Sequence, residues 1–171
     1  MLNLALQENH LQQRVLAENL LRRGGVRINL DDANFIFPRL PEEYLISKTF
    51  GTYQVRLAPA YIQDKQRRQI GAFEAHQLDP NLIRIRILSR HVQAAHHTCF
   101  IQYHQELNEN IRDPITGTYC TCKVGAKTLG VCAHVASVIW YLSYGRHPEN
   151  EAHYPSNNLL TVIIDAAHRH E

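Results

Sequence analysis

The sequence predicts an α+β fold: a small antiparallel sheet with a metal-bound C-terminal helix, preceded by an N-terminal helix. Three patterns lead to this fold class. Residues 82–90 and 98–104 alternate between two kinds of side chain, whereas residues 133–144 and residues 2–23 repeat apolar side chains at helical spacing. With 171 residues, of which 44% are hydrophobic, the chain is long enough to bury a core of its own.

The first predicted element is an amphipathic helix over residues 2–23, which Gly24 and Gly25 end. Residues 29–43 contain two prolines and are predicted to form an extended connector. We therefore expect three parts. They are an N-terminal helix and connector (1–43), an α+β domain (44–148) and a C-terminal tail (149–171).

The clearest strand pattern covers residues 82–90, where isoleucines and arginines alternate. Residues 98–104 are predicted to pair with it in antiparallel fashion, with Cys99 on the inward face, and residues 115–120 supply a third strand. One face of the first strand is then apolar and the other is basic. The apolar face carries Ile83, Ile85 and Ile87, and the basic face carries Arg84, Arg86 and Arg90.

The second helix is predicted over residues 133–144. Its apolar side chains fall at the i, i+3, i+4 and i+7 positions of one helical face, and Gly145 with the later Pro148 ends it. We expect this face to pack on the sheet and to carry the core. The stripe consists of Val135, Val138, Ile139 and Leu142.

Cysteine and histidine form two pairs in the second half of the chain. Cys120 and Cys122 make a C-x-C pair, and Cys132 and His134 make a C-x-H pair after nine intervening residues. Three thiolates and one imidazole are a closed tetrahedral set, typical of a structural zinc site, whereas catalytic zinc keeps a position open for water. We therefore predict one structural Zn²⁺, bound where the third strand ends and the C-terminal helix begins; the alternative is three buried cysteines and a core histidine without metal.

The remaining cysteine, Cys99, lies near His91, His96 and His97 in the sequence, and these four could be read as a second metal site. Its place on the inward strand face favours a buried thiol instead. If the other three thiols bind metal, none is left as a nucleophile with a neighbouring base. We therefore predict that the chain is not an enzyme.

The run from Tyr119 to Leu142 resembles a SWIM-type zinc finger, because its C-x-C and C-x-H pairs match that pattern at all four positions. Residues 38–147 are more widely similar to the C-terminal region of transposase-derived SWIM proteins of animal mobile elements, from Phe50-Gly51-Thr52 through residues 83–91 to Gly145-Arg146-His147. The resemblance implies a finger over about residues 116–145. It further implies an accessory domain that binds DNA or protein and lacks a catalytic core.

Charge is unevenly distributed along the chain. The net charge is only +2, yet residues 48–104 hold eight basic and three acidic side chains, a local excess of five. A basic strand face beside the loop between the ligand pairs suits a phosphate backbone, so we predict binding to DNA, with RNA as a second candidate. The alternative is an ordinary solvated sheet face. The predicted nucleic-acid contacts are Arg84, Arg86, Arg90, Lys123 and Lys127.

A protein-protein interaction module is the second functional hypothesis. Trp140, Tyr141 and Tyr144 on the C-terminal helix are the residue types that anchor interfaces, and the leucine-rich N-terminal helix is another candidate contact.

The N-terminal residues lack the basic and long apolar regions of a secretory signal, and no apolar run is long enough for a membrane span. The sequence therefore predicts an intracellular, nuclear protein.

Overall fold

The fold is built on a five-stranded antiparallel sheet in which the strands follow one another in chain order, β1-β2-β3-β4-β5. A computed structural model describes residues 10–49, 58–59, 62, 73–88, 96–108, 110–111, 113–123 and 131–153. The strands are β1 (Val26–Ile28), β2 (Glu74–Asp79), β3 (Leu82–Leu88), β4 (His96–Tyr103) and β5 (Ile115–Cys120).

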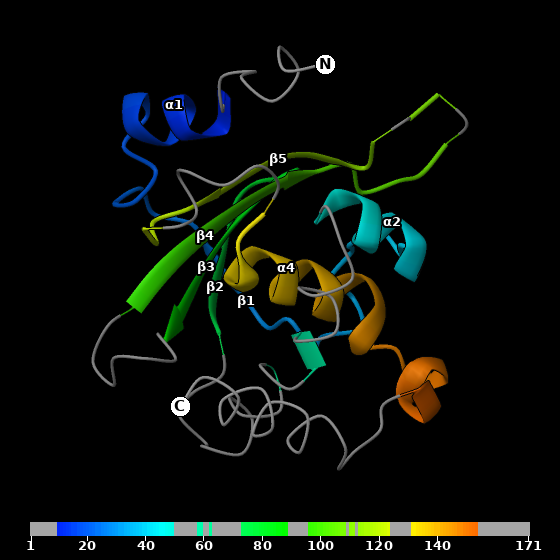
Figure 1. Cartoon of the computed structure of the whole chain (residues 1–171). Coiled ribbons are helices and arrows are strands. Elements are labelled where there is room, and N and C mark those ends of the chain that lie inside the picture. The colour runs from blue at the N-terminus through cyan, green and yellow to red at the C-terminus, as the bar shows by residue number, and fades with distance from the viewer. Residues whose placement is uncertain are drawn as a thin grey trace, which may run out of the picture.

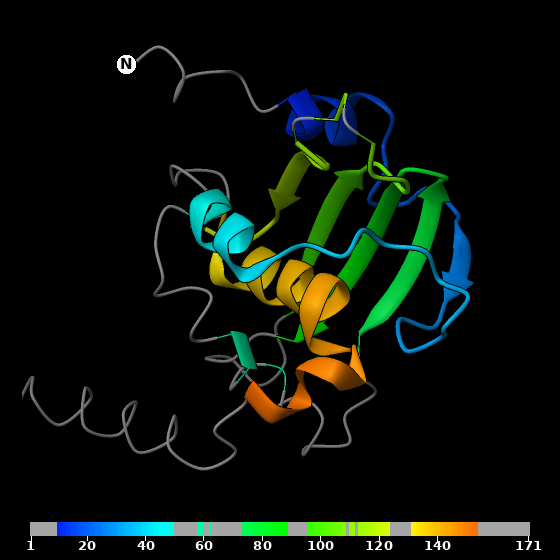
Figure 2. The ribbon, with the colours of Figure 1, turned by 90° about the vertical axis from the view of Figure 1, so that its right-hand side faces the viewer.

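Helices cover both faces of this sheet. Figure 1 shows α1 (His10–Ala17) on one side of the strands and α2 (Glu42–Lys48) with α4 (Ala133–Trp140) on the other. Seen after a turn of 90°, α2 and α4 lie across the same face of the sheet (Figure 2). A π-helical turn, η2 (Tyr141–Gly145), continues α4, and the 3₁₀ helix η3 (Pro148–His153) follows it.

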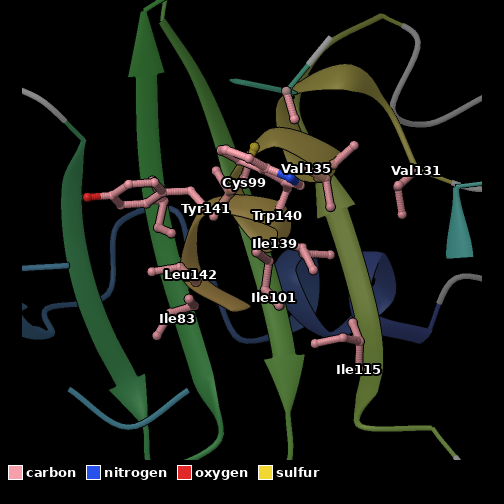
Figure 3. Close-up of a cluster of buried hydrophobic side chains, with 14 of the residues drawn as sticks. Ile83, Cys99, Ile101, Ile115, Val131, Val135, Ile139, Trp140, Tyr141 and Leu142 are labelled. Atoms are coloured by element: carbon pink, nitrogen blue, oxygen red, sulfur yellow. The ribbon is translucent and has the colours of Figure 1, made fainter. Parts of the chain in front are cut away.

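The main core lies between the sheet and α4. Alternate residues of β3 and β4 point to this side, and Figure 3 shows Ile83 and Ile101 facing Ile139 and Leu142 of the helical segment. All four predicted stripe residues of this helix are buried. The predicted apolar face of β3 is confirmed, because Ile83, Ile85 and Ile87 are almost fully removed from solvent.

A second, smaller core lies on the opposite face, beneath α1. Leu11 and Val15 of α1 pack on Leu82 of β3 and Phe100 of β4. The Phe100 ring stacks on the ring of Tyr119 of β5, with 6.1 Å between the ring centroids. Arg14 pairs with Asp79 of β2 at 2.6 Å and holds the helix in place. The face predicted to be basic is thus apolar where α1 covers it and basic only over the rest.

Most predicted elements are present within the described residues. The strands predicted at 82–90, 98–104 and 115–120 correspond to β3, β4 and β5, and α4 with η2 covers the second predicted helix. Of the first predicted helix, α1 accounts for residues 10–17, and residues 1–9 lie outside the described part. The predicted end at Gly24 is wrong: the helix ends at Ala17 and residues 18–22 form turns, with Asn19 in the left-handed region (φ 50°). The α+β class and the antiparallel sheet are confirmed, and the sheet is larger than expected, with five strands.

The connector predicted at residues 29–43 is only partly extended. It runs without regular structure to Pro41, but α2 begins at Glu42, inside the predicted connector. Its apolar residues enter the main core instead of lying on a linker, and the division predicted at residue 44 falls between the buried side chains of Leu40 and Leu45. The buried residues of this segment are Leu30, Phe35, Phe37, Pro38 and Leu40, whereas Ile36 is exposed.

Candidate metal centre

Four side chains predicted as metal ligands come together at the junction of β5 and α4. Cys120 ends β5, Cys122 lies in the bend after it, Cys132 is the N-cap residue of α4, and His134 is the second residue of that helix. Their ligand atoms all lie within 4.8 Å of one another. The three thiols are buried and the imidazole is half-buried, so the group is able to hold one metal ion inside the core.

Thr121 explains why the chain turns between the first two cysteines. Its backbone N–H donates to Thr98 O at 3.1 Å, but its hydroxyl oxygen, in place of its carbonyl, accepts from Thr98 N at 2.9 Å. Because a side chain replaces the backbone acceptor, the β4–β5 ladder ends here and the chain bends. This bend brings the Cys122 thiol back toward Cys120.

The second pair is positioned by the start of α4. Cys132 has extended dihedral angles (φ −70°, ψ 165°), and its carbonyl accepts the first helical hydrogen bond, from Ala136 N at 2.9 Å. The unpaired N–H groups of a helix N-terminus carry partial positive charge, which favours a thiolate there. The predicted position of this pair, just before and just inside the helix, is confirmed.

The distances from His134 to two of the thiols are close to those of a tetrahedral centre. His134 Nδ1 lies 3.9 Å from Cys120 Sγ and 3.8 Å from Cys132 Sγ. Bond lengths of about 2.3 Å to sulfur and about 2.05 Å to nitrogen place neighbouring tetrahedral ligands about 3.6 Å apart. The Nδ1 atom of His134 is therefore the ring nitrogen placed to bind the ion.

Hydrogen bonds between the thiols, together with burial, hold the pKa values of Cys120 and Cys132 above their ordinary value. A hydrogen bond with Cys120 and then burial raise the pKa of the Cys132 thiol to about 12. The hydrogen bond with Cys132 lowers the pKa of Cys120, but the contact with Cys99 and burial outweigh it and hold that pKa well above its ordinary value. Binding of a divalent ion therefore releases protons, because a thiol binds metal as a thiolate.

Two residues of β4, which the sequence analysis did not assign to this centre, lie against its ligands. The Cys99 thiol donates to Cys120 Sγ at 3.6 Å, and the ring of His97 lies 4.7 Å from the ring of His134. Burial lowers the pKa of His97. The prediction of a buried thiol at Cys99 is confirmed, since its side chain is 0% exposed. Only strand pairing, which sets Cys99 opposite Cys120, reveals this proximity.

The structure describes three of the five residues predicted to contact nucleic acid: Arg84, Arg86 and Lys123. Arg84 is half-buried, and its Nη1 donates to the carbonyls of Leu20, Leu21 and Arg23 at 2.8, 3.1 and 2.7 Å, which ties it to the turn after α1. Arg86 is exposed and lies 3.7 Å from Glu74. Lys123 is exposed beyond the bend. Arg90 and Lys127 lie outside the described residues.

Other basic side chains join Arg84 and Arg86 on the same sheet face. Cross-strand pairing places Arg27 of β1 opposite His76 of β2, and His76 opposite Arg84 of β3. Arg27 and Arg86 are exposed and His76 is half-buried. We call Arg27, His76, Arg84 and Arg86 the basic face. The first two members of this face were not predicted, because they lie on β1 and β2, which show no clear strand pattern in the sequence.

The aromatic side chains predicted as interface anchors are mostly internal. Trp140 and Tyr141 are buried in the main core, and Trp140 lies 6.3 Å from the half-buried ring of Tyr144. The apolar face of α1 packs on its own sheet. Within the described residues, α4 presents no residue of its apolar stripe to solvent, whereas α1 leaves Leu16 64% exposed.

Comparison of the chain with family models, with curated proteins and with solved structures gave no match. The resemblance to SWIM proteins and a transposase origin therefore stay predictions. No helix in the described ranges combines the length and apolar character needed to cross a membrane.

Proposed function

We propose that the chain is a zinc-stabilised accessory domain that binds duplex nucleic acid, DNA in the first place, through its basic face. Cys120, Cys122, Cys132 and His134 would hold one Zn²⁺. Their sulfur-rich donor set and their mutual distances fit that ion, and a closed set of four protein ligands gives it a structural role. The ion would tie the end of β5 to the start of α4.

The nucleic-acid part of the proposal depends on the row that runs from Arg27 through His76 to Arg84, with Arg86 beside it. Adjacent strands are about 4.8 Å apart, so charges on neighbouring strands follow a phosphate backbone at close intervals. Arg84 is held by three backbone carbonyls and is therefore rigidly placed. Such contacts bind phosphates and position the partner without reading bases.

The positions of the aromatic rings on this face favour a duplex partner over a single strand. Phe100 and Tyr119 continue the Arg27–His76–Arg84 row, but Phe100 is fully buried beneath α1 and Tyr119 packs beside it. Single-strand binders use exposed rings as platforms on which bases stack. With Phe100 buried and Tyr119 half-buried beside it, the row offers mainly its basic side chains. Reduced thiols and a nucleic-acid partner together suit a nuclear protein.

The test is a salt titration of binding to double-stranded and single-stranded probes, using zinc-loaded protein. Binding is expected to weaken steeply with salt, and Arg86→Gln is expected to reduce the salt slope by about 1, as loss of one phosphate contact does. Arg84 is left unchanged, because its substitution would also release the turn after α1.

Arg39→Gln is the matched control, since Arg39 is also exposed and, like Arg86 with Glu74, pairs with a glutamate, Glu149 of η3. It removes the same charge away from the basic face and is expected to leave the slope unchanged. Equal slopes for both variants, or no affinity for any probe at low salt, would contradict the proposed interface. An unchanged zinc content in that case would leave the metal part of the proposal standing.

A further inference from the structure

The Cys99 thiol is placed against the metal centre by strand register. Cys99 of β4 is the cross-strand partner of Cys120 of β5. The neighbouring pair, Thr98 and Thr121, is joined by a backbone hydrogen bond, so Cys99 and Cys120 form the adjacent pair without hydrogen bonds, in which side chains approach most closely. The two sulfur atoms are accordingly 3.6 Å apart, with Cys99 as donor.

The surroundings of this contact exclude competing water. Cys99 is 0% and Cys120 is 1% exposed, and Ile85 and Ile101 flank Cys99 on the same side of the sheet. Three thiolates on one dication leave a net charge of about −1 in the core. A buried negative charge is costly unless polar hydrogens face it, and a hydrogen bond strengthens in such a medium. The S–H group of Cys99 is able to supply such a hydrogen, because its sulfur lies 3.6 Å from a ligand sulfur.

We propose that Cys99 is a positioning residue of the metal centre: its S–H group donates to the metal-bound thiolate of Cys120, orients that ligand and raises the affinity of the site. This inference depends on the metal binding proposed above. Partners that hydrogen-bond to ligands typically change metal affinity by 10–100-fold when they are removed. Cys99 itself stays outside the ligand set, because the four-ligand group is complete without it.

The test compares Cys99→Ala with Cys99→Ser in the full chain. Zinc affinity is measured by competition with a chromophoric chelator, and Co²⁺ replaces zinc for spectroscopy. Alanine removes the donor and is expected to weaken zinc binding about tenfold and to shift the sulfur-to-cobalt charge-transfer bands to longer wavelength. Serine keeps a donor and is expected to restore affinity and spectrum close to those of the unchanged protein.

Ile101→Val is the control for packing, because Ile101 is the next buried residue on the same face of β4 and is not part of the ligand cluster. It is expected to lower stability without moving the cobalt bands. The inference is overturned if Cys99→Ala binds zinc and cobalt as the unchanged protein does. It is also overturned if alanine and serine weaken binding alike, in line with Ile101→Val, with unchanged spectra. An unchanged protein that binds neither ion would instead contradict the metal site itself.

Discussion

Asp113 connects α2 to the start of β5. Its carboxylate accepts hydrogen bonds from the Tyr44 hydroxyl, from Lys48 Nζ at 2.5 Å and from Ile115 N at 3.1 Å. Partial burial raises the pKa of Asp113, but the bonds from Lys48 and Tyr44 outweigh this and hold the pKa below its ordinary value. The carboxylate therefore stabilises the fold at neutral pH, even though half of its side-chain surface is exposed.

Replacing Asp113 with asparagine is expected to lower the free energy of unfolding by about 1 kcal/mol at pH 7, because exposed pairs are screened by water. A depressed pKa in the fold means that this stabilisation is complete above the unfolded-state pKa of about 4 and is lost as pH falls through the lower, folded-state pKa. Urea denaturation at pH 7 and pH 3 should show the two proteins converging in acid.

The control for this prediction is Glu106→Gln, which removes an acidic charge from an exposed loop position. It is expected to change stability little at either pH. A constant difference between Asp113→Asn and the unchanged protein from pH 7 to pH 3 would show that the carboxylate charge is not the cause.

The ligand residues are the part of the site that the sequence predicts best, because metal coordination demands particular side chains at short spacing. Cys120, Cys122, Cys132 and His134 all come from one stretch of chain, and the structure brings them together. The contacts of Cys99 and His97 with the ligands could not be predicted in this way, since these residues approach Cys120 and His134 only through pairing of β4 with β5. Contacts across a sheet depend on register, which local spacing does not contain.

At the scale of the elements, α4 and η2 depend on close packing around one glycine. The π-helical turn brings Gly145 against the indole of Trp140, where an added Cβ would lie 2.5 Å from Cζ3 and 2.7 Å from Cη2. That ring is buried and has little room to move. A side chain at residue 145 would therefore push the indole into the main core.

We expect Gly145→Ala to lower the free energy of unfolding by about 1–3 kcal/mol, the usual cost of overpacking. Gly24→Ala is its matched control, because no atom lies within 4 Å of the added Cβ there. That control should be neutral or stabilise by up to about 1 kcal/mol, through a less flexible unfolded chain. Both values come from urea denaturation followed by fluorescence of Trp140, the chain's single tryptophan; equal values for the two variants would rule out the steric explanation.

Elements differ in how far the sequence predicts them, and the difference has a physical cause. β3 and α4 bury a regular stripe, so their periodicity is visible in the residues themselves. β1 has only three residues, and β2 reads Glu-Ala-His-Gln-Leu-Asp, which is mostly polar. These two strands are stabilised by pairing with β3 and with each other. Because neighbouring strands stabilise β1 and β2, their side chains need no regular apolar stripe, and the sequence shows little periodicity there.

At the scale of the whole molecule, the proposed metal links the two sides of the main core, the sheet at the end of β5 and the helix at the start of α4. The ligand thiols belong to the same buried cluster as Ile83, Ile101 and Leu142. The sheet is also covered by α1 on its other face, so the fold has apolar support that does not involve the ion. Loss of metal should therefore loosen the α4 side of the core before it affects the sheet as a whole.

Elemental analysis is expected to find about one zinc per chain. A strong chelator should lower the free energy of unfolding by about 4 kcal/mol, relative to protein with free zinc a thousandfold above its dissociation constant. Cys122→Ser should make the protein insensitive to the chelator, because it removes a ligand. Thermal melts with and without chelator measure both effects. A protein that contains no zinc and melts at the same temperature with and without chelator would refute the metal site.

The strand order also sets the sequence of folding events. All four strand pairings join strands that follow one another in the chain, and the three among β2 to β5 each close a short connection. The pairing of β1 with β2 instead closes the long segment 29–73, and loop-closure entropy grows with length. The hairpins of β2 to β5 should therefore assemble first and provide the edge on which β1 docks last. One arginine of the basic face, Arg27, is carried by β1, so the proposed nucleic-acid surface is completed only at the final folding step.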